Sequence, residues 1–406
     1  MSKCLVCHED SVSKLLDFGK NPVCNDFTES EGQENKKFPL ILGFCEKCGL
    51  AQLINPFPQE ELKPKYSWIS YNEPESHLDK VADNISPLPN ISKDSKILGI
   101  SYKDDTLLQR MKKLGYSNIK RLDLQKDLGD NDGYGDIETI QKLMNQKTAE
   151  EILKKYGKFD VIFSRHILEH TYDIHGFVSS LKILLNENGY IIFEIPDYTK
   201  PFQYKDYSSI WEEHIIYFTP QTFKNSFPFL GLELKKFDAY SYPLENSLVA
   251  IVKISKQEKK LPDNNILKEE KDRILSFTQS FATIKDKTNS YLSELSKKGE
   301  KIAVFGAGHN ACFLVNVFGI AKYLNCFVDD NINKRGMYMP GSKLEIRGLS
   351  ILSEGDIHLC IFSLNPEIEE KIISKNDNLK GSVDFLSFCP KSQRSIYDQL
   401  KVKNET

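Results

Sequence analysis

The middle of the chain alternates between short, strongly apolar runs and longer stretches of mixed polarity. The apolar runs at 96–100, 119–124, 159–163 and 190–195 are rich in β-branched and aromatic residues, and the segments between them have helical character. This order is typical of buried strands connected by crossover helices. It predicts a parallel, doubly wound α/β domain.

A second pattern begins after a polar stretch at 253–263, which contains four lysines and one proline and reads as a linker. Apolar residues then recur every seven positions in two rows offset by three, as expected for one long amphipathic helix. From Lys301 the segment KIAVFGAG opens another strand and helix, with further strands expected at 325–328 and 358–362. The two apolar rows are Leu267, Ile274 and Phe281, and Phe277, Ile284 and Tyr291.

The fold class is therefore predicted as α/β, with four parts along the chain. A small cysteine-bearing module is expected at 1–62 and the doubly wound domain at 63–255. A helical linker follows at 256–300, and a second, Rossmann-like α/β domain at 301–406.

Composition narrows the classes of partner. The 406 residues include 54 Lys and Arg against 57 Asp and Glu, a net charge of -3, so the chain has no basic excess for nucleic acid. No run approaches the ~18 apolar residues of a membrane span, and the N-terminus has no apolar h-region. We therefore expect a cytoplasmic protein that binds neither nucleic acid nor membrane.

Four of the nine cysteines form two C-x-x-C pairs, Cys4 with Cys7 and Cys45 with Cys48. Two such pairs can place four thiolates around one Zn²⁺ ion in a closed, structural site. His8 and Cys24 are less favoured substitutes in this ligand set. The other cysteines lie in apolar segments and are expected as small core residues: Cys312, Cys326, Cys360 and Cys389.

The first α/β domain carries one signal for an adenosine-bearing cofactor and one against a dinucleotide. Asp123 ends a predicted strand about 20 residues after the first loop, where a carboxylate can accept ribose hydroxyls. The loop at 99–105, GISYKDD, lacks the G-x-G that lets a backbone approach a pyrophosphate, so a dinucleotide is not expected here.

Candidate acid–base residues cluster after two later strands. His166, Glu169 and His170 follow the run FDVIFS, at the strand end where open α/β sheets place their ligands. Further on, His214 stands beside Glu213, an arrangement suited to general-base chemistry. A satisfied structural histidine is the alternative at position 214.

The last domain permits a different interpretation. KIAVFGAGHNA fits a strand, a G-x-G-x-x-A turn and a helix, and Asp329 and Asp330 follow the next strand. That pattern is typical of a nicotinamide dinucleotide site and would make the protein an oxidoreductase. No catalytic Lys, Tyr or Cys for hydride chemistry is identifiable beside it.

Taken together, the motifs resemble those of the S-adenosylmethionine-dependent sugar C-methyltransferases, which act on keto-deoxy nucleotide sugars. The resemblance spans the chain and rests on the order of its motifs: CLVC, LDFGKNPVCNDF, FCEKCGLAQL, DVIFSRHILEH, EEHIIYFTP, FGAGHNACFLVNVFGI and FVDDNINKRGMYMPG. It implies a zinc-binding module, a class I methyltransferase domain and a C-terminal nucleotide-sugar-binding domain. The cofactors would be S-adenosylmethionine and a structural Zn²⁺.

The resemblance also implies roles for individual residues. His214 would remove the proton alpha to the sugar ketone, with Glu213 as its partner and the Tyr66 hydroxyl near the ketone. The Gly306–Asn310 loop would bind the diphosphate at a helix N-terminus. The expected cofactor-binding residues are Ser101, Asp104, Asp123, Arg165 and His166, and the expected substrate-binding residues are Trp211, Gly306, Gly308, His309 and Asn310. The protein would act as a monomer or homodimer.

At three places the chain differs from the family pattern. Its cofactor loop has lost the family's acidic residue and glycines, Trp211 replaces a tyrosine, and Glu245-Asn246-Ser247 stands where the family has Gly-Gly-Ser. These differences leave rival functions open: an epimerase or tautomerase that moves only a proton, transfer to oxygen or nitrogen, or a non-catalytic sugar-binding protein.

Overall fold

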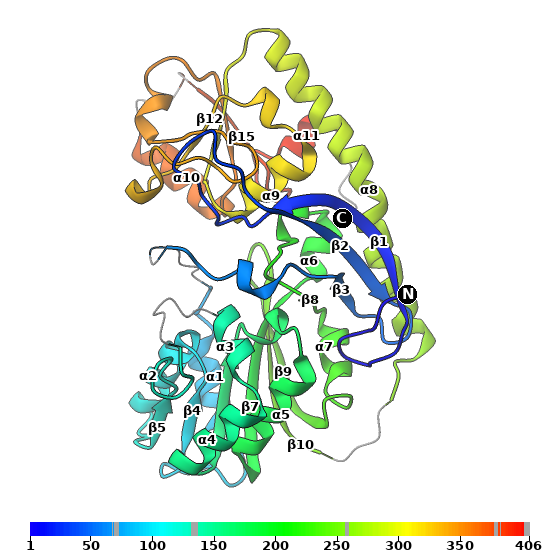
Figure 1. The fold of residues 1–406 in the computed structure, drawn as a ribbon, viewed down its shortest axis with the longest axis vertical. Helices are drawn as coiled ribbons and strands as arrows, with labels where there is room; N and C mark the ends of the chain where they lie inside the picture. The colour runs from blue at the N-terminus through cyan, green and yellow to red at the C-terminus, as the bar shows by residue number, and fades with distance from the viewer. Residues whose placement is uncertain are drawn as a thin grey trace.

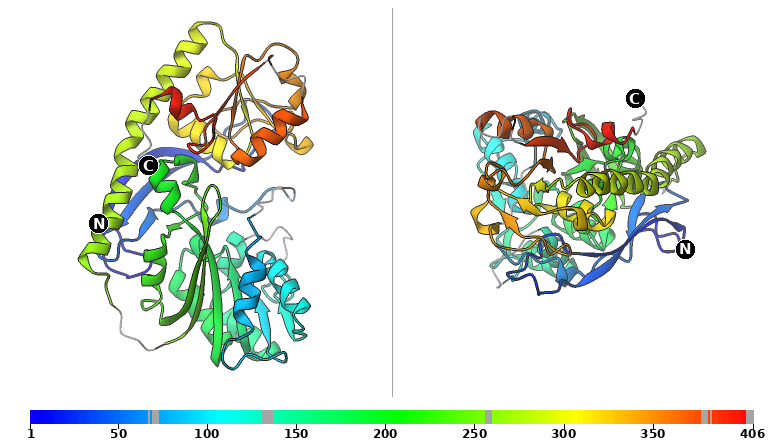
Figure 2. Two further views of the ribbon diagram at one scale, coloured as in Figure 1. Left: turned by 180° about the vertical axis from the view of Figure 1, so that it is seen from behind. Right: turned by 90° about the horizontal axis from the view of Figure 1, so that it is seen from above.

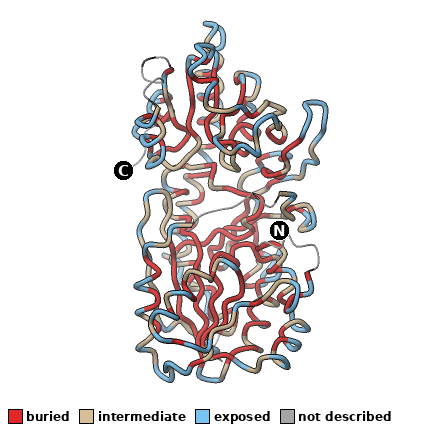
Figure 3. The backbone as a smooth tube through the Cα atoms, turned by 90° about the vertical axis from the view of Figure 1, so that its left-hand side faces the viewer, coloured by how far each residue is buried: buried red, intermediate tan, exposed pale blue. Residues whose placement is uncertain are grey.

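The computed structural model describes residues 1–66, 68, 73–130, 137–255, 260–376, 381 and 383–401. Two α/β lobes lie one above the other, and an antiparallel sheet from the N-terminal part of the chain reaches from one to the other (Figure 1). One long helix runs along the side of both lobes, as the view from behind also shows (Figure 2). Buried segments fill the interior of both lobes (Figure 3).

The lower lobe is built on a six-stranded sheet of order β5-β4-β6-β7-β10-β9. The four strands β5, β4, β6 and β7 are parallel to one another, whereas β10 is antiparallel to both of its neighbours, β7 and β9. Val161, Ile162 and Phe163 of β6 are fully buried, because helices cover both faces of this sheet and leave no polar face. The strands are β4 (Ile97–Gly99), β5 (Ile119–Arg121), β6 (Phe159–Arg165), β7 (Leu185–Asp197), β9 (Leu232–Tyr240) and β10 (Asn246–Ile254).

Helices in this lobe include several with clear end signals. Asn145 caps α4 by accepting a hydrogen bond from Thr148 N, and Thr219 with Pro220 begins α7. The helices are α1 (Leu78–Ile85), α2 (Asp105–Lys113), α3 (Ile137–Leu143), α4 (Gln146–Tyr156), α5 (Ile174–Leu184), α6 (Thr199–Tyr204) and α7 (Pro220–Ser226), with 3-10 turns η2 (Tyr102–Asp104), η3 (Leu168–His170) and η4 (Tyr207–Ser209).

The upper lobe holds a five-stranded parallel sheet of order β13-β12-β11-β14-β15. Its first strand leads through Gly306 and Gly308 into α9 (His309–Phe318). The strands are β11 (Ile302–Phe305), β12 (Cys326–Val328), β13 (Ile346–Arg347), β14 (Leu359–Phe362) and β15 (Asp384–Ser387), with α10 (Pro366–Lys375), α11 (Ile396–Gln399), η5 (Ala321–Tyr323), η6 (Ile332–Lys334) and η7 (Leu349–Leu352).

The N-terminal sheet has the order β1-β2-β3-β8, with the short turn η1 (Gln59–Glu61) after it. β1 (Val12–Pro22), β2 (Lys37–Cys45) and β3 (Ala51–Ile54) come from the first 62 residues. The fourth strand, β8 (Ile216–Tyr217), comes from the segment directly after His214 and pairs with β3. The sequence did not predict this pairing, which fastens the N-terminal module to the middle of the chain.

The long helix α8 (Asn264–Lys297) begins where Asp263 accepts hydrogen bonds from Asn265 N and Ile266 N. Its apolar row packs inward: Phe277 is fully buried and Ile284 almost so. Along its length α8 contacts α6, β1 and α9, elements of three different parts of the chain. The helix α8 therefore packs against three parts of the chain at once and is more than a linker between two domains.

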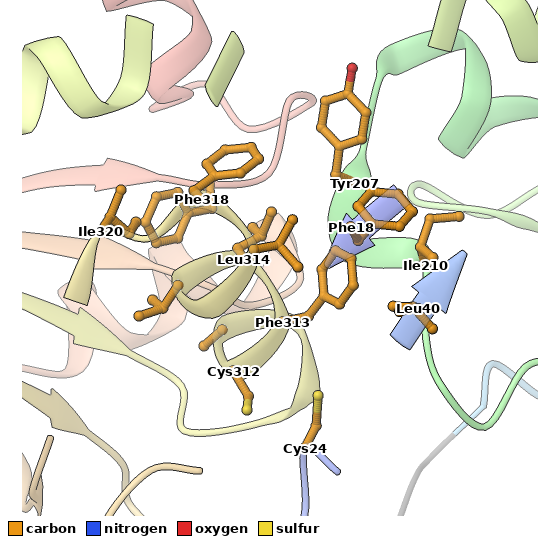
Figure 4. Packing of buried hydrophobic residues seen from close by; sticks show 14 of the residues in the cluster. Phe18, Cys24, Leu40, Tyr207, Ile210, Cys312, Phe313, Leu314, Phe318 and Ile320 are labelled. Atoms are coloured by element: carbon orange, nitrogen blue, oxygen red, sulfur yellow. The ribbon is translucent and has the colours of Figure 1, made fainter. Parts of the chain in front are cut away.

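A single aromatic cluster joins these parts (Figure 4). Phe18 of β1 packs edge-on against Phe281 of α8 and Phe313 of α9, with ring centroids 5.2 and 5.4 Å apart. Tyr207 of η4 packs on Phe281 from the lower lobe and donates a hydrogen bond to the Phe277 carbonyl. The hairpin of β1 and β2 thus lies between the two lobes as part of one core.

The α/β class, the doubly wound middle domain, the long helix and the second parallel sheet are confirmed. None of the helices in the described ranges combines the length and apolarity that crossing a bilayer requires. Part of the expected linker, 256–259, lies outside the described residues.

Candidate functional site

The four cysteines of the two C-x-x-C pairs converge in one buried cluster. Cys4 Sγ lies 3.6 Å from Cys48 Sγ, and Cys7 Sγ lies 3.6 Å from Cys45 Sγ. These separations exclude disulfides, which need about 2.05 Å. They are close to the roughly 3.8 Å between sulfurs that bind zinc tetrahedrally at ~2.3 Å. The cluster has the ligand set and spacing that a structural zinc site needs, in agreement with the prediction from the sequence.

Neighbouring groups hold the thiolates in place. Ser11 Oγ lies 3.1 Å from Cys45 Sγ, and the backbone N–H of Cys48 points at the same sulfur. Gly49 has a φ of +79°, a backbone conformation that residues with a side chain rarely adopt. Its N–H donates a hydrogen bond to the Cys45 carbonyl. The tight knuckle after Cys48 therefore depends on this glycine.

The expected cofactor loop after β4 is shaped by one buried carboxylate. Asp104 Oδ2 accepts hydrogen bonds from Ile100 N and Ser101 N, and Oδ1 accepts one from Arg165 N. Burial raises the pKa of Asp104 to about 6, although these backbone donors oppose the shift. Ser101 caps the turn η2 from the other side by accepting from Lys103 N. Both residues thus organise the loop backbone rather than point side chains at a ligand.

Arg165 and His166, at the end of β6, enter a buried charge network around Glu194. Arg165 Nε pairs with Glu194 Oε2, and His166 Nε2 lies 3.3 Å from Glu194 Oε1. His77 Nε2 is 2.9 Å from the same oxygen. Burial opposes charge on His166, but Glu73, Glu169 and Glu194 outweigh it and raise its pKa to about 10. His166 therefore stays protonated at neutral pH.

Asp123, the expected ribose ligand, follows β5 at the surface. Its Oδ1 accepts hydrogen bonds from Gln125 N and Lys126 N, and these donors hold its pKa below the ordinary range. The carboxylate is therefore ionised, and its Oδ2 takes part in neither bond. The structure does not bring Asp123 to the cavities that contain His214.

His214 lies between the two lobes and lines two cavities. Its Nδ1 is hydrogen-bonded to the hydroxyl of Tyr198, which follows β7. Burial, and then the nearby His170, His309 and His166, lower the pKa of His214 well below its usual range. The imidazole is therefore neutral, the form that can accept a proton.

The residues around His214 include one that sequence reasoning did not select. Tyr198 stands in the segment EIPDY, and its place directly after a central strand was the available signal. His170 packs edge-on against His214, and Glu138 Oε1 lies 2.6 Å from His170 Nδ1. Glu169 is 1% exposed, and neither of its carboxylate oxygens has a hydrogen-bond partner.

The glutamates before His214 bind the N-terminal segment. Glu212 accepts hydrogen bonds from Cys24 N and Cys24 Sγ, and Glu213 Oε1 accepts one from Asn25 Nδ2. Tyr198, and not the expected partner Glu213, makes the hydrogen bond to His214 Nδ1. Cys24 lies outside the zinc cluster.

Tyr66 does not line either of the cavities that His214 lines. Its hydroxyl donates a hydrogen bond to the Phe27 carbonyl at 3.3 Å, and its ring stacks on Trp68 with centroids 4.9 Å apart. The structure therefore does not bring together the three side chains that the sequence assigned to catalysis.

Trp211 and His309 meet across the boundary between the lobes. Their rings stack with centroids 4.1 Å apart and an interplanar angle of 11°. Trp211 belongs to the segment before His214, whereas His309 is the first residue of α9. The stack joins two residues that the sequence expected to contact substrate.

The loop before α9 has two glycines with different constraints. Gly306 has a φ of +101°, and a Cβ there would lie 2.7 Å from Leu364 Cδ2. Gly308, the N-cap of α9, has open space on its Cβ side. Asp329 Oδ2 accepts from Ala307 N and pairs with Lys334 Nζ, so its carboxylate closes this loop instead of facing a ribose. That arrangement disfavours the nicotinamide interpretation.

Three cavities surround Trp211, His214 and His309. The inner cavity has a free volume of about 60 Å³. The interdomain cavity measures about 450 Å³ and the aromatic cavity about 320 Å³. The inner cavity is lined by residues that include Tyr102, Lys103, His166, Glu169, His170 and His214; the interdomain cavity by Tyr198, Trp211, His214, Glu245, His309 and Asn310; the aromatic cavity by Phe27, Trp68, Gly308, His309, Asn310 and Lys334.

Replacing Asp104 is expected to lower the stability of the protein, whereas replacing Asp123 is expected to weaken ligand binding without a large loss of stability. Asp104→Ala leaves three buried backbone donors without a partner and should lower the free energy of unfolding by about 3 kcal/mol or more. Asp123→Ala, at the surface, should change stability by less than ~1 kcal/mol but weaken binding of an adenosyl ligand. Urea unfolding together with calorimetry checks both. Equal loss of stability in the two variants would contradict this assignment.

Three family models match successive parts of the chain. The model described as "putative zinc binding domain" matches residues 4–62, a methyltransferase domain matches 74–236, and a C-methyltransferase C-terminal domain matches 249–388. The C-methyltransferase NovU of Streptomyces niveus is 20% identical over 361 residues, which cover 85% of this chain and 85% of that protein.

Solved structures also match the chain. One is the Burkholderia thailandensis 1,6-didemethyltoxoflavin-N1-methyltransferase with bound S-adenosylhomocysteine, at 9% identity and a TM-score of 0.31, covering 45% of this chain and 80% of that one. Another is the CcbJ methyltransferase from Streptomyces caelestis, at 8% identity and a TM-score of 0.29, covering 47% of this chain and all of that one.

Proposed function

Because the chain belongs to the S-adenosylmethionine-dependent C-methyltransferase family that carries a zinc module, we propose that it methylates a carbon atom of a nucleotide-linked keto-deoxy sugar. The protein is a methyltransferase with S-adenosylmethionine and Zn²⁺ as cofactors. The sugar substrate and the role of His214 as a base are what we propose. The main support for them is that a neutral His214 lies where the inner and interdomain cavities meet.

His214 is suited to remove a proton alpha to a ketone. If Nδ1–H donates to the Tyr198 oxygen, Nε2 keeps its lone pair and can accept the proton. Tyr198 then positions His214 by holding its tautomer and ring orientation. The enolate carbon left behind is the nucleophile that receives the methyl group.

The inner cavity suits the charge of the methyl donor. S-adenosylmethionine supplies an electrophilic methyl group on a positively charged sulfonium. Glu169 presents two buried carboxylate oxygens without hydrogen bonds to this cavity, and a cation nearby would compensate their burial. His166 lines the donor's site, and Ser101, Asp104 and Arg165 shape the backbone beside it, whereas Asp123, outside the inner cavity, would contact the ribose of the adenosyl group.

The inner cavity must open to admit the donor. Its free volume of about 60 Å³ is far below the ~300–1,000 Å³ of typical ligand pockets. Lys103 Nζ lies 3.3 Å from Glu73 Oε1, and both side chains line the cavity. We therefore expect this ion pair to separate when the donor binds.

The nucleotide diphosphate is assigned to the N-terminus of α9. Gly308, His309 and Asn310 lie there and line the aromatic cavity, beside Phe27 and Trp68. A helix N-terminus presents unpaired N–H groups and a partial positive charge to an anion. The aromatic side chains suit a nucleobase, which can stack on them.

The two glycines before α9 offer a matched test of this assignment. Gly308→Ala has room for its methyl group, so stability should change little, but the methyl group would crowd the anion site and weaken nucleoside diphosphate binding about tenfold. Gly306→Ala, strained at its φ of +101° and crowded by Leu364, should lose about 2 kcal/mol or more of stability. Calorimetry and thermal melting check these outcomes; unchanged affinity in Gly308→Ala would contradict the assignment.

The overall reaction is tested by incubating zinc-loaded protein with S-adenosylmethionine and a panel of nucleotide keto-deoxy sugars. Mass spectrometry should find one added methyl group, and NMR should place it on carbon. Stereochemical inversion without methyl gain would instead support the proton-transfer enzyme. A methyl group on oxygen or nitrogen would refute C-methylation.

A further inference from the structure

Carboxylates dominate the two cavities that meet at His214. Among the described residues that line them, Lys103 is the only lysine or arginine. His166 adds one further cation, and His214 and His309 are neutral because burial lowers the pKa of each. The acidic residues of the two linings are Glu73, Glu138, Asp206, Glu169, Glu213 and Glu245.

Glu169 and Glu245 differ from the other acidic residues of this set because no nearby cation or hydrogen-bond donor fully compensates the charge of their carboxylates. Neither oxygen of the buried Glu169 accepts a hydrogen bond, and its nearest cationic atom, His166 Nδ1, is 3.6 Å away. In the described part of the chain Glu245 makes no hydrogen bond or ion pair. Burial and the nearby Glu73 raise the pKa of Glu245 to about 8. A cationic group brought beside it would restore the ionised carboxylate.

The two carboxylates differ in the cavities that they line. Glu169 lines only the inner cavity, together with Tyr102 and Lys103 of the donor loop. Glu245 also lines the interdomain cavity, which reaches His309 and the N-terminus of α9. The sulfonium of the methyl donor belongs on the Glu169 side. Glu245, which lines both cavities, is therefore the one of the two carboxylates that can reach the acceptor.

From this arrangement we propose, resting on the function proposed above, that the acceptor is an amino sugar and that Glu245 binds its protonated amino group. The diphosphate would lie at the N-terminus of α9, where His309 and Asn310 line both the aromatic and the interdomain cavity, while the ammonium lies against Glu245 in the interdomain cavity. Glu245 occupies one of the positions where the chain differs from the Gly-Gly-Ser of the family it resembles. Glu245 would then be the residue that determines specificity for the amino group.

A hydroxyl group at the same position would interact less strongly. It could donate one neutral hydrogen bond, whereas an ammonium forms a charge-assisted bond in a site with few competing cations. A neutral sugar should therefore bind about 10- to 100-fold more weakly than its amino counterpart.

The test compares matched nucleotide sugars in binding, without turnover. Uridine- and thymidine-diphosphate deoxyhexoses that carry an amino group at C3 or C4 are titrated against their hydroxyl counterparts, with S-adenosylhomocysteine present. We expect at least one amino sugar to bind the wild type 10-fold or more tightly than its counterpart. In Glu245→Gln the preference should disappear, while the free nucleoside diphosphates bind as before.

Controls exclude other causes. Glu187→Gln removes an exposed carboxylate on β7 and should keep the preference. Glu245→Gln should melt no lower than the wild type, because it removes a half-buried carboxylate that lies near Glu73 and has no hydrogen bond or ion pair among the described residues. Glu169, His170 and His214 also place ligand atoms within 4.8 Å of one another, so elemental analysis checks that each titrated sample holds one zinc per chain and no second metal ion. A preference that appears only in samples with a second metal ion would show a divalent cation instead and overturn the proposal.

The outcomes also separate this inference from the proposed function. Equal binding of amino and hydroxyl sugars, with nucleoside diphosphates bound and a neutral keto sugar methylated, would overturn only the role of Glu245. A preference that persists in Glu245→Gln would do the same. Failure of every nucleotide and nucleotide sugar to bind would overturn both proposals.

Discussion

His214→Gln is expected to lower kcat for methyl transfer by about 10²- to 10⁴-fold, the contribution typical of a positioned general base. Glutamine keeps a polar side chain of similar size but cannot accept a proton at neutral pH. The neighbouring Tyr198, Trp211 and His170 should remain in place. Binding of S-adenosylmethionine should therefore change little.

The decisive readout is proton exchange alpha to the ketone. With S-adenosylhomocysteine bound, no methyl transfer is possible, and the wild type should exchange this proton with D₂O at a rate that NMR can follow. His214→Gln should not. Tyr198→Phe should reduce the exchange rate about tenfold, because Nδ1 loses its partner while the base remains.

Two control variants complete this experiment. Tyr66→Phe should have a smaller effect than Tyr198→Phe, since the Tyr66 hydroxyl faces the Phe27 carbonyl. His358→Ala, a half-exposed histidine paired with Glu300 in the upper lobe, should leave activity unchanged. Full exchange in His214→Gln would mean that another residue is the base, and Glu213 would be the next to test.

Local sequence patterns predicted the features that depend on local chemistry. The seven-residue apolar rows predicted α8, because one face of a helix must pack whatever its partner is. The C-x-x-C pairs predicted the zinc site, because each pair binds through its own short turn. Both predictions are confirmed without reference to distant parts of the chain.

Features that depend on distant pairing were missed. β8 pairs with β3 across more than 150 residues of sequence, and two residues of strand carry no periodic signal of their own. The bond between Tyr198 and His214 joins residues from two segments of the lower lobe, and the stack of Trp211 on His309 arises only after the lobes pack. The sequence identified His214 as a candidate base from its residue type, but only the structure shows which side chains fix the position of its ring.

Loss of zinc is expected to abolish activity although the zinc cluster contains no residue of the cavities around His214. The Cys45→Ser variant, or removal of the metal with a strong chelator, should leave the β2–β3 knuckle without its cross-link. Structural zinc contributes ~10–16 kcal/mol of binding free energy in zinc-finger peptides, so several kcal/mol of folding free energy should be lost here.

The path from the zinc site to His214 is short and made of backbone bonds. Leu53 N of β3 donates to the Ile215 carbonyl, and Ile215 N donates to the Glu169 carbonyl. Unravelling of β3 would therefore release the residues on either side of the site, His214 and Glu169. Activity should fall with the zinc content, and the melting transition should broaden or split.

Cys326→Ala is the matched control, because this buried cysteine of β12 lies in the upper lobe outside the zinc cluster. It should lose about 1 kcal/mol of stability but keep one zinc per chain and near-normal activity. Elemental analysis, melting and turnover are measured on the same samples. A zinc-free Cys45→Ser protein that retains activity and melting temperature would show that β8 is held by the hydrophobic core alone, and that the metal is dispensable for placing His214.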